Sequence, residues 1–233
     1  MASLLTLPEE IMLLTLNDET GKVEHVSFWA GYVNYKHAVA GAVLAELALQ
    51  DRIEITGEGK TLKVGLLDAT PIGSAFVDAC LAEIAGKEKP QSAEHWVGKL
   101  ASQKDMRGRI ASQLAGKGIL DLESDSAWIF FTKEVYPTID PAPERALRER
   151  IRSAVMSDEA NVDARTCALL AIGEKTGFNA MLFTKDERKD RQGRIEFLIA
   201  GDPAGDAVAA KIASIQAMVT TIVVIYAIST IAS

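Results

Sequence analysis

A helix start near the N-terminus constrains this chain more than any other feature. Within residues 5–16, Thr6 can cap a helix, and Pro8 occupies the first turn, where proline is tolerated. Glu9 and Glu10 follow, and carboxylates at these positions complement the positive end of the helix dipole. Apolar residues recur at helical spacing, and a turn sequence rich in Asp, Thr and Gly comes next. We therefore expect a short amphipathic helix that packs against a core.

The composition is that of a chain that can build one sizeable core. Of its 233 residues, 48% are hydrophobic and 24% are charged. The formal net charge of −7 opposes bulk attraction to nucleic acid or to anionic membranes, so any anion site must be a local patch. Cys80 and Cys167 lie in apolar helical runs, which favours buried thiols over disulfides. No signal peptide precedes the first helix, so we expect a cytoplasmic protein.

The remaining pattern predicts a mainly α protein decorated by short β-hairpins. Period-two alternation on both sides of Gly57–Gly59 predicts one hairpin. A helix over 104–116, followed by strand-like segments at 118–122 and 128–131, predicts a winged-helix-like β-hairpin. No internal repeat separates these elements, so we expect a single globular helical domain over residues 1–233. Further helices are predicted over 27–50, 72–85, 144–156, 162–175 and 185–198.

The C-terminal segment 217–233 carries no charge and is apolar on all sides of a helix. A membrane-spanning helix needs about 20 apolar residues, and this run is shorter and contains five Ser and Thr residues. A helix that is apolar all round is otherwise a core helix. We therefore expect residues 217–231 to be buried in the protein, with contact to a membrane as the alternative.

Catalytic and metal-binding patterns are absent from the sequence. His25, His37 and His95 share no metal-ligand spacing with one another or with the cysteines. The segment 57–61 resembles the end of a phosphate-binding loop, but Glu54 occupies the position where that motif needs glycine. No nucleophile-elbow sequence is present. We therefore predict that the protein is not an enzyme and uses no metal or other cofactor.

Six segments occur in an order that is characteristic of one family. They are Leu5-Thr6-Leu7 with its acidic pair, Ala40–Leu49, Ile72–Leu81, Trp96 with Leu100, Arg107–Leu120 and Asp163–Leu169. Together they resemble the core domain of the Golgi phosphoprotein 3 family. The resemblance implies the fold of that family and the role of a phosphoinositide-reading membrane adaptor.

The same resemblance implies a lipid headgroup site. The family binds phosphatidylinositol 4-phosphate with one Trp and three Arg residues. The Trp matches Trp29, one Arg matches Arg107, and its partner one turn earlier is Lys104 here. Lysine is a point charge and lacks the bidentate fork with which arginine binds phosphate.

The third arginine of the family matches Ala40, so one charge is lost. Two extra residues lie between Trp29 and that position, in the region of Lys36 and His37. We expect these two side chains to support the headgroup site. The alternative is that the basic residues only form a solvated helix face.

The predicted wing carries Trp128, Phe130 and Phe131 on both of its faces. A bare two-stranded hairpin cannot bury both faces at once. The resemblance implies that this wing inserts into a bilayer or packs on a second copy of the chain. The alternative is that it folds back on the core.

The resemblance as a whole implies a peripheral adaptor on the cytoplasmic face of a membrane. Its expected partners are phosphatidylinositol 4-phosphate or another anionic phospholipid, the membrane surface and an unknown protein cargo, without nucleic acid. Eukaryotic members carry a long basic N-terminal tail, and this sequence starts almost at the family signature, so we expect a prokaryotic-type member. The alternative is a protein-interaction or structural module that kept the fold and lost lipid binding.

Overall fold

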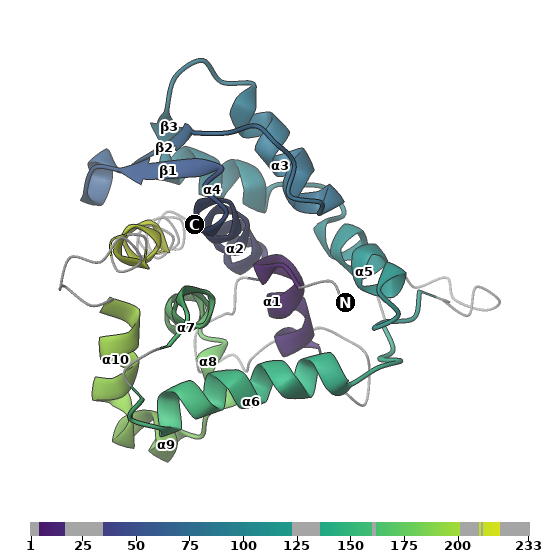
Figure 1. Ribbon diagram of the computed structural model, residues 1–233, viewed down its shortest axis with the longest axis vertical. Helices are drawn as coiled ribbons and strands as arrows, with labels where there is room; N and C mark the ends of the chain where they lie inside the picture. The colour runs from purple at the N-terminus through teal and green to yellow at the C-terminus, as the bar shows by residue number, and fades with distance from the viewer. Residues whose placement is uncertain are drawn as a thin grey trace, which may run out of the picture.

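The computed structural model describes residues 5–16, 35–122, 136–159, 162–200, 210 and 212–219, and this part of the chain is mainly helical (Figure 1). A small three-stranded antiparallel sheet accompanies the helices. The predicted fold class is therefore confirmed.

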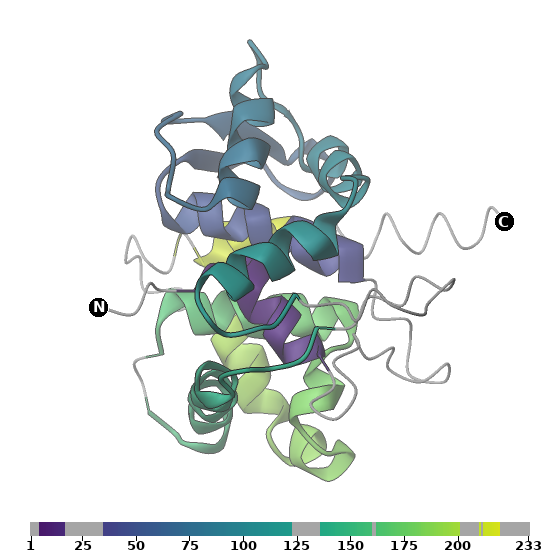
Figure 2. The ribbon, with the colours of Figure 1, turned by 90° about the vertical axis from the view of Figure 1, so that its right-hand side faces the viewer.

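Two helices near the N-terminus lie in the middle of the molecule, α1 (Leu7–Thr15) and α2 (Tyr35–Leu49). The sheet, α3 and α4 lie at one end of the long axis, and α6, α9 and α10 lie at the other (Figures 1 and 2). The first group comprises β1 (Ile53–Thr56), the 3-10 turn η1 (Gly59–Thr61), β2 (Lys63–Leu66), α3 (Ala75–Ala85), β3 (Gln91–Ser92) and α4 (Ala93–Ala101), followed by α5 (Met106–Gly116). The second comprises α6 (Ala142–Met156), α7 (Ala164–Thr176), α8 (Asn179–Leu182), α9 (Lys185–Asp190) and α10 (Gln192–Ala200).

The hairpin predicted around Gly57 is present. Strand β1 pairs with β2 in antiparallel register, and β2 also pairs with β3. Gly57 has a φ of +87°, and a Cβ there would lie 2.7 Å from the carbonyl oxygen of Thr61, so the turn requires glycine. The segment 59–61 forms a 3-10 turn between strands, which differs from a phosphate-binding loop that opens a helix.

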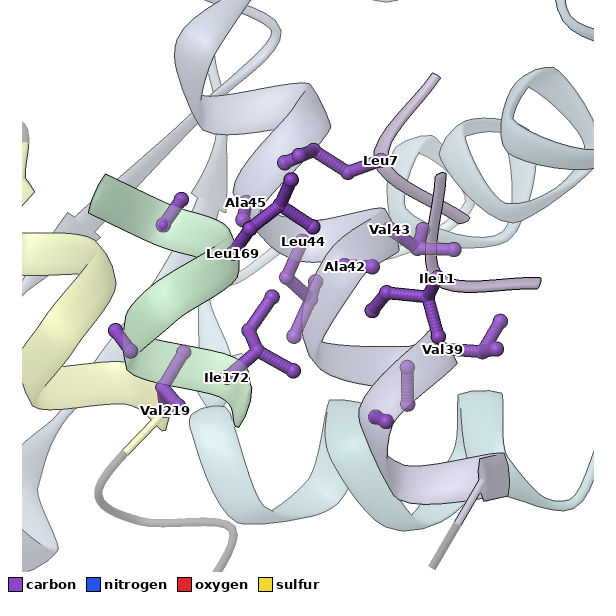
Figure 3. Close-up of a cluster of buried hydrophobic side chains, with 14 of the residues drawn as sticks. Leu7, Ile11, Val39, Ala42, Val43, Leu44, Ala45, Leu169, Ile172 and Val219 are labelled. Atoms are coloured by element: carbon purple, nitrogen blue, oxygen red, sulfur yellow. The ribbon is translucent and has the colours of Figure 1, made fainter. Parts of the chain in front are cut away.

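The core is built around α2. Residues 38–48 of this helix are all buried, which explains why this part of the sequence shows no polar face. Its small residues allow close approach of the neighbouring helices, and α1 and α7 both pack against it. Figure 3 shows Leu7 and Ile11 of α1, Leu169 and Ile172 of α7 and Val219 near the C-terminus around the side chains of α2.

The described part of the C-terminal segment packs into this core. Residues 212–219 are helical, and their buried side chains, at helical spacing, are Ile212, Ile215, Met218 and Val219. The predicted burial of residues 217–231 is thus seen for 218 and 219, while Ala217 is partly buried. Residues 220–231 lie outside the described residues. Among those described, no helix combines the length and the apolar character needed to cross a bilayer.

The base of the predicted wing is an antiparallel bridge between Leu120 and Thr138. The Asp121 N–H donates to the carbonyl of Pro137 at 2.8 Å, and the Ile139 N–H donates to that of Ile119 at 2.9 Å. These bonds join the two ends of segment 123–135. The wing residues Trp128, Phe130 and Phe131 lie outside the described part of the chain.

Several predicted helices differ from the structure by two or three residues at their ends, and two of the differences have a visible cause. The helix predicted to start at Lys104 begins at Met106, because Asp105 adopts a left-handed conformation with φ of +50°. The helix predicted over 185–198 is interrupted at Arg191, which separates α9 from α10. The Arg191 guanidinium contacts Asp158 and donates to the carbonyl of Met156. The chain therefore turns where a side chain binds the end of α6.

Candidate functional site

The starts of α2 and α5 meet at a contact between an arginine and an aromatic ring. The guanidinium carbon of Arg107, the second residue of α5, lies 5.0 Å from the centroid of the Tyr35 ring at the start of α2. This distance is within the range of a cation–π interaction. The fold thus brings one of the predicted headgroup residues to the segment that contains Lys36 and His37.

Two exposed lysines flank this contact. Lys104 lies in the turn that precedes α5, and Lys36 follows Tyr35 on α2. Within the described residues neither lysine forms an ion pair. Both ammonium groups are therefore exposed to solvent on the two elements that meet at Arg107.

His37 contributes less charge than its sequence position suggested. The imidazole is half-buried, and burial lowers its pKa below the usual value of 6.5. The ring is therefore neutral at pH 7, so it can offer a hydrogen bond to an anion without the charge. Trp29 lies outside the described residues, and its relation to Arg107 stays a prediction.

Ala40 occupies the position of the third family arginine and is fully buried in α2. The chain therefore supplies no charge from this position. Burial also explains why a small apolar residue is suited to it, because an unpaired guanidinium in the core would be strongly destabilising.

Arg109 does not join Arg107. Its guanidinium carbon lies 4.9 Å from the centroid of the Phe76 ring of α3, and it donates a hydrogen bond to Gln103 at 3.4 Å. Residues two apart on a helix point in different directions, so this agrees with the expectation that Arg109 supports the fold.

The acidic pair of the N-terminal signature is buried and ion-paired. Glu9 and Glu10 are almost inaccessible to solvent. Lys117 Nζ lies 2.7 Å from Glu9 Oε2, and Arg150 Nη2 lies 3.0 Å from Glu10 Oε1. The sequence pattern had indicated only a favourable interaction with the helix dipole. The pairs tie α1 to the end of α5 and to α6, so the acidic pair has a structural role.

A third buried carboxylate, Glu46 of α2, completes this network, and sequence reasoning missed it. Glu46 accepts two hydrogen bonds from the Arg165 guanidinium, at 2.7 and 2.9 Å, and one from the Leu7 N–H at 2.7 Å. Arg165 Nη1 also lies 3.7 Å from Glu10. A charged residue inside an otherwise apolar helix is the one signal that could have indicated a buried partner.

Exposed apolar side chains lie beside the base of the predicted wing. Leu122 is 46% exposed and Ile139 is 61% exposed. They flank the bridge between Leu120 and Thr138. An exposed apolar surface of this kind is typical of a contact with a membrane or a protein, although single exposed apolar residues are common.

Potential metal ligands do not cluster in the part of the chain that the structure describes. No group of three or more His, Cys, Asp or Glu residues there could hold a metal ion. An open hollow of about 370 Å³ lies along the end of α6, lined by Glu149, Arg152, Ser153, Met156 and Ser157. Arg152 in this lining is engaged by Glu187 at 2.6 Å.

Comparison with known proteins identifies the family. The family model described as Golgi phosphoprotein 3 (GPP34) matches residues 7–215. Vacuolar protein sorting-associated protein 74 from Eremothecium gossypii is 26% identical over 170 residues, covering 65% of this chain and 49% of the relative. The chain thus spans about half the length of this curated relative. Because the family model covers most of the sequence, the protein belongs to the Golgi phosphoprotein 3 family, whose members are non-enzymatic adaptors.

Proposed function

We propose that this protein is a peripheral membrane adaptor that binds phosphatidylinositol 4-phosphate, or another anionic lipid headgroup, where α2 and α5 begin. The observation that carries the proposal is the contact between Arg107 and Tyr35. It joins the family-matched arginine to the start of α2, and Trp29 lies only six residues earlier in the sequence. Backbone N–H groups at helix starts favour phosphate, which supports the same location.

The charge available at this location predicts weak, salt-sensitive binding. Arg107, Lys104 and Lys36 are the cations, and Ala40 stands where the family has its third arginine. Each basic residue near an anionic surface contributes roughly 1 kcal/mol, and the contribution decreases within a Debye length. The net charge of −7 opposes the approach of the whole molecule to such a surface. A second source of affinity is therefore needed.

We assign this second source to the predicted wing. Trp128, Phe130 and Phe131 supply aromatic surface, and the exposed Leu122 and Ile139 at the wing base extend it. Insertion of these side chains into the bilayer, or their packing on a second copy of the protein, buries apolar area that salt does not screen. The protein cargo that completes the adaptor role is a separate partner of unidentified sequence on the cytoplasmic face.

Flotation with phosphatidylcholine vesicles tests the proposal at two salt concentrations. One vesicle set contains phosphatidylinositol 4-phosphate, and others contain phosphatidylinositol or phosphatidylserine. We expect Arg107→Ala to weaken binding roughly fivefold at low salt and less at high salt, because its contribution is electrostatic. Trp128→Ser should weaken binding at both salt concentrations. Lys189→Ala removes an exposed charge on α9, away from α5, and should have no effect.

Three results would contradict parts of this account. If Arg107→Ala binds as well as the unmodified protein, the headgroup location is wrong. If Arg107→Ala abolishes binding at every salt concentration while wing variants bind normally, a tight headgroup pocket replaces the two-part account. If the unmodified protein floats with no vesicle, the alternative function holds: an interaction module that kept the fold and lost the lipid site, as Lys104 and Ala40 favour.

A further inference from the structure

An acidic residue with an unusual backbone lies between the two basic residues of the proposed headgroup site. Asp105 separates Lys104 from the first turn of α5, and its φ of +50° is in the left-handed region. Residues other than glycine rarely adopt this conformation, although Asp and Asn tolerate it best. Asp105 therefore has a left-handed backbone conformation that is unfavourable for most residues other than glycine.

The carboxylate of Asp105 is folded against the backbone of Gly108. A Cβ at position 108 would lie 2.9 Å from Cγ and from Oδ2 of Asp105, and still closer to Oδ1. Real Cβ atoms do not approach other atoms this closely, so any side chain at 108 would push the carboxylate away. Glycine at this position is what allows the negative group to lie over the first turn of α5.

Helix capping does not explain this arrangement. The side chain of Asp105 accepts no capping hydrogen bond from the first turn of α5. Among the described residues this side chain also has no ion-pair or hydrogen-bond partner, in contrast to Asp163, whose carboxylate caps α7 with a bond of 2.9 Å. A negative charge is thus held at the positive end of a helix without the bond that normally accompanies it.

We propose that Asp105 is an internal competitor that limits how tightly the site at α5 binds a phosphate monoester. The inference rests on the proposed headgroup site. A phosphate that approaches Lys104 and Arg107 meets a carboxylate of like charge at the same helix start, and the repulsion opposes binding. Because Coulomb repulsion scales with the charge of the ligand, Asp105 opposes a phosphorylated headgroup more strongly than a singly charged one.

Two substitutions remove the competitor in different ways. Asp105→Asn removes the charge and keeps the shape and the tolerance for a left-handed backbone. Gly108→Ala keeps the charge and displaces the carboxylate, since the neighbouring atoms belong to an exposed, movable side chain. Glu88→Gln, in the exposed loop before β3, changes the net charge by the same amount elsewhere and serves as the matched control.

The experiment compares these variants in flotation with vesicles of phosphatidylcholine plus phosphatidylinositol 4-phosphate, and with vesicles that carry phosphatidylserine instead. Asp105→Asn should bind the first vesicles roughly fivefold more tightly than the unmodified protein, which is the effect of one unit charge near an anionic surface. Gly108→Ala should gain less, because it moves the charge away from the first turn of α5 and does not remove it. The gain should be smaller with phosphatidylserine. The double variant should gain no more than the better single variant, and Glu88→Gln should gain little.

Titration with the soluble headgroup inositol 1,4-bisphosphate distinguishes a free phosphate from a membrane lipid as the ligand. The same gain in both assays assigns the competition to the phosphate itself. Thermal unfolding verifies that every variant is folded.

If Asp105→Asn binds no more tightly than the unmodified protein, the competitor role of Asp105 is wrong. If Arg107→Ala still weakens binding in that case, the proposed lipid-binding function stands without the competitor. Failure of both the unmodified protein and Asp105→Asn to bind any vesicle overturns both. Binding by Asp105→Asn alone supports the competitor.

Discussion

Glu46 shows how one residue can hold several elements together. Its carboxylate lies in the core, accepts hydrogen bonds from Arg165 and from the Leu7 N–H, and thereby links α2 to α7 and to the start of α1. Arg165 also donates to the carbonyl of Leu5 at 3.0 Å. A buried ion pair adds little net stability, because desolvation offsets the attraction, but removal of one partner leaves an uncompensated charge.

We therefore predict that Glu46→Ala lowers the free energy of unfolding by about 3–5 kcal/mol, which is the usual cost of breaking a buried pair. Asp158→Ala breaks the ion pair between Asp158 and Arg191. The Asp158 side chain is largely exposed, so this loss should cost less than about 1 kcal/mol. Urea unfolding of both variants measures the difference. Equal costs would show that the Glu46 pair is solvated and would remove it from the account of the core.

At the scale of elements, the carboxylate of Glu187 at the start of α9 joins that helix to α6. Glu187 of α9 accepts a hydrogen bond from the Thr184 N–H at 2.7 Å, and the Thr184 hydroxyl accepts one from the Glu187 N–H. The same carboxylate binds Arg152 of α6 at 2.6 Å. The hydrogen bond from Arg152 foremost, and then that from Thr184, lower the pKa of Glu187 to about 2.

This lowered pKa predicts how stability depends on pH. The folded protein holds Glu187 ionised more strongly than the unfolded chain, whose pKa is 4.5. The stabilisation is therefore complete above pH 4.5 and is lost as the pH falls from 4.5 towards 2.

Glu187→Gln should flatten this part of the profile of unfolding free energy against pH. Asp186→Asn, in the same turn and exposed, should leave it unchanged. Urea unfolding over this pH range gives the two slopes. If the unfolding free energy of Glu187→Gln falls as steeply with decreasing pH as that of the unmodified protein, other carboxylates cause the loss of stability.

At the scale of the whole molecule, one cluster of buried apolar side chains includes residues of α1, α2, α3, α7 and the C-terminal helical segment. We propose, as the sequence predicted, that residues 1–233 form a single domain. A continuous core makes unfolding cooperative, because no part can open without exposing surface that another part buries.

The single domain predicts that distant substitutions affect one transition. Ile215→Ala removes a buried side chain near the C-terminus and should cost about 2–5 kcal/mol. It should lower the midpoint of the same transition that Glu46→Ala lowers, although residues 46 and 215 lie far apart in the sequence. Circular dichroism and tryptophan fluorescence, to which the fully buried Trp96 contributes, should report coincident transitions. Two separate transitions, each sensitive to one substitution, would instead divide the chain into two domains.

The sequence by itself determined the features that depend on neighbouring residues. The mainly helical class, the first helix and the turn at Gly57 were all predicted from local patterns. Such patterns act over a few residues, since capping, periodicity and turn conformation are local. The order of motifs also indicated the family, and the match of the family model to residues 7–215 confirms that family.

Tertiary structure decided what depends on residues far apart in the chain. The burial of Glu9 and Glu10, the contact of Arg107 with Tyr35 and the break between α9 and α10 all involve partners from other elements. A local pattern assigns an acidic residue at a helix start to the dipole, whatever lies opposite it. Only packing shows whether a charge meets water, an ion partner or a ring, because desolvation and pairing are properties of the assembled core.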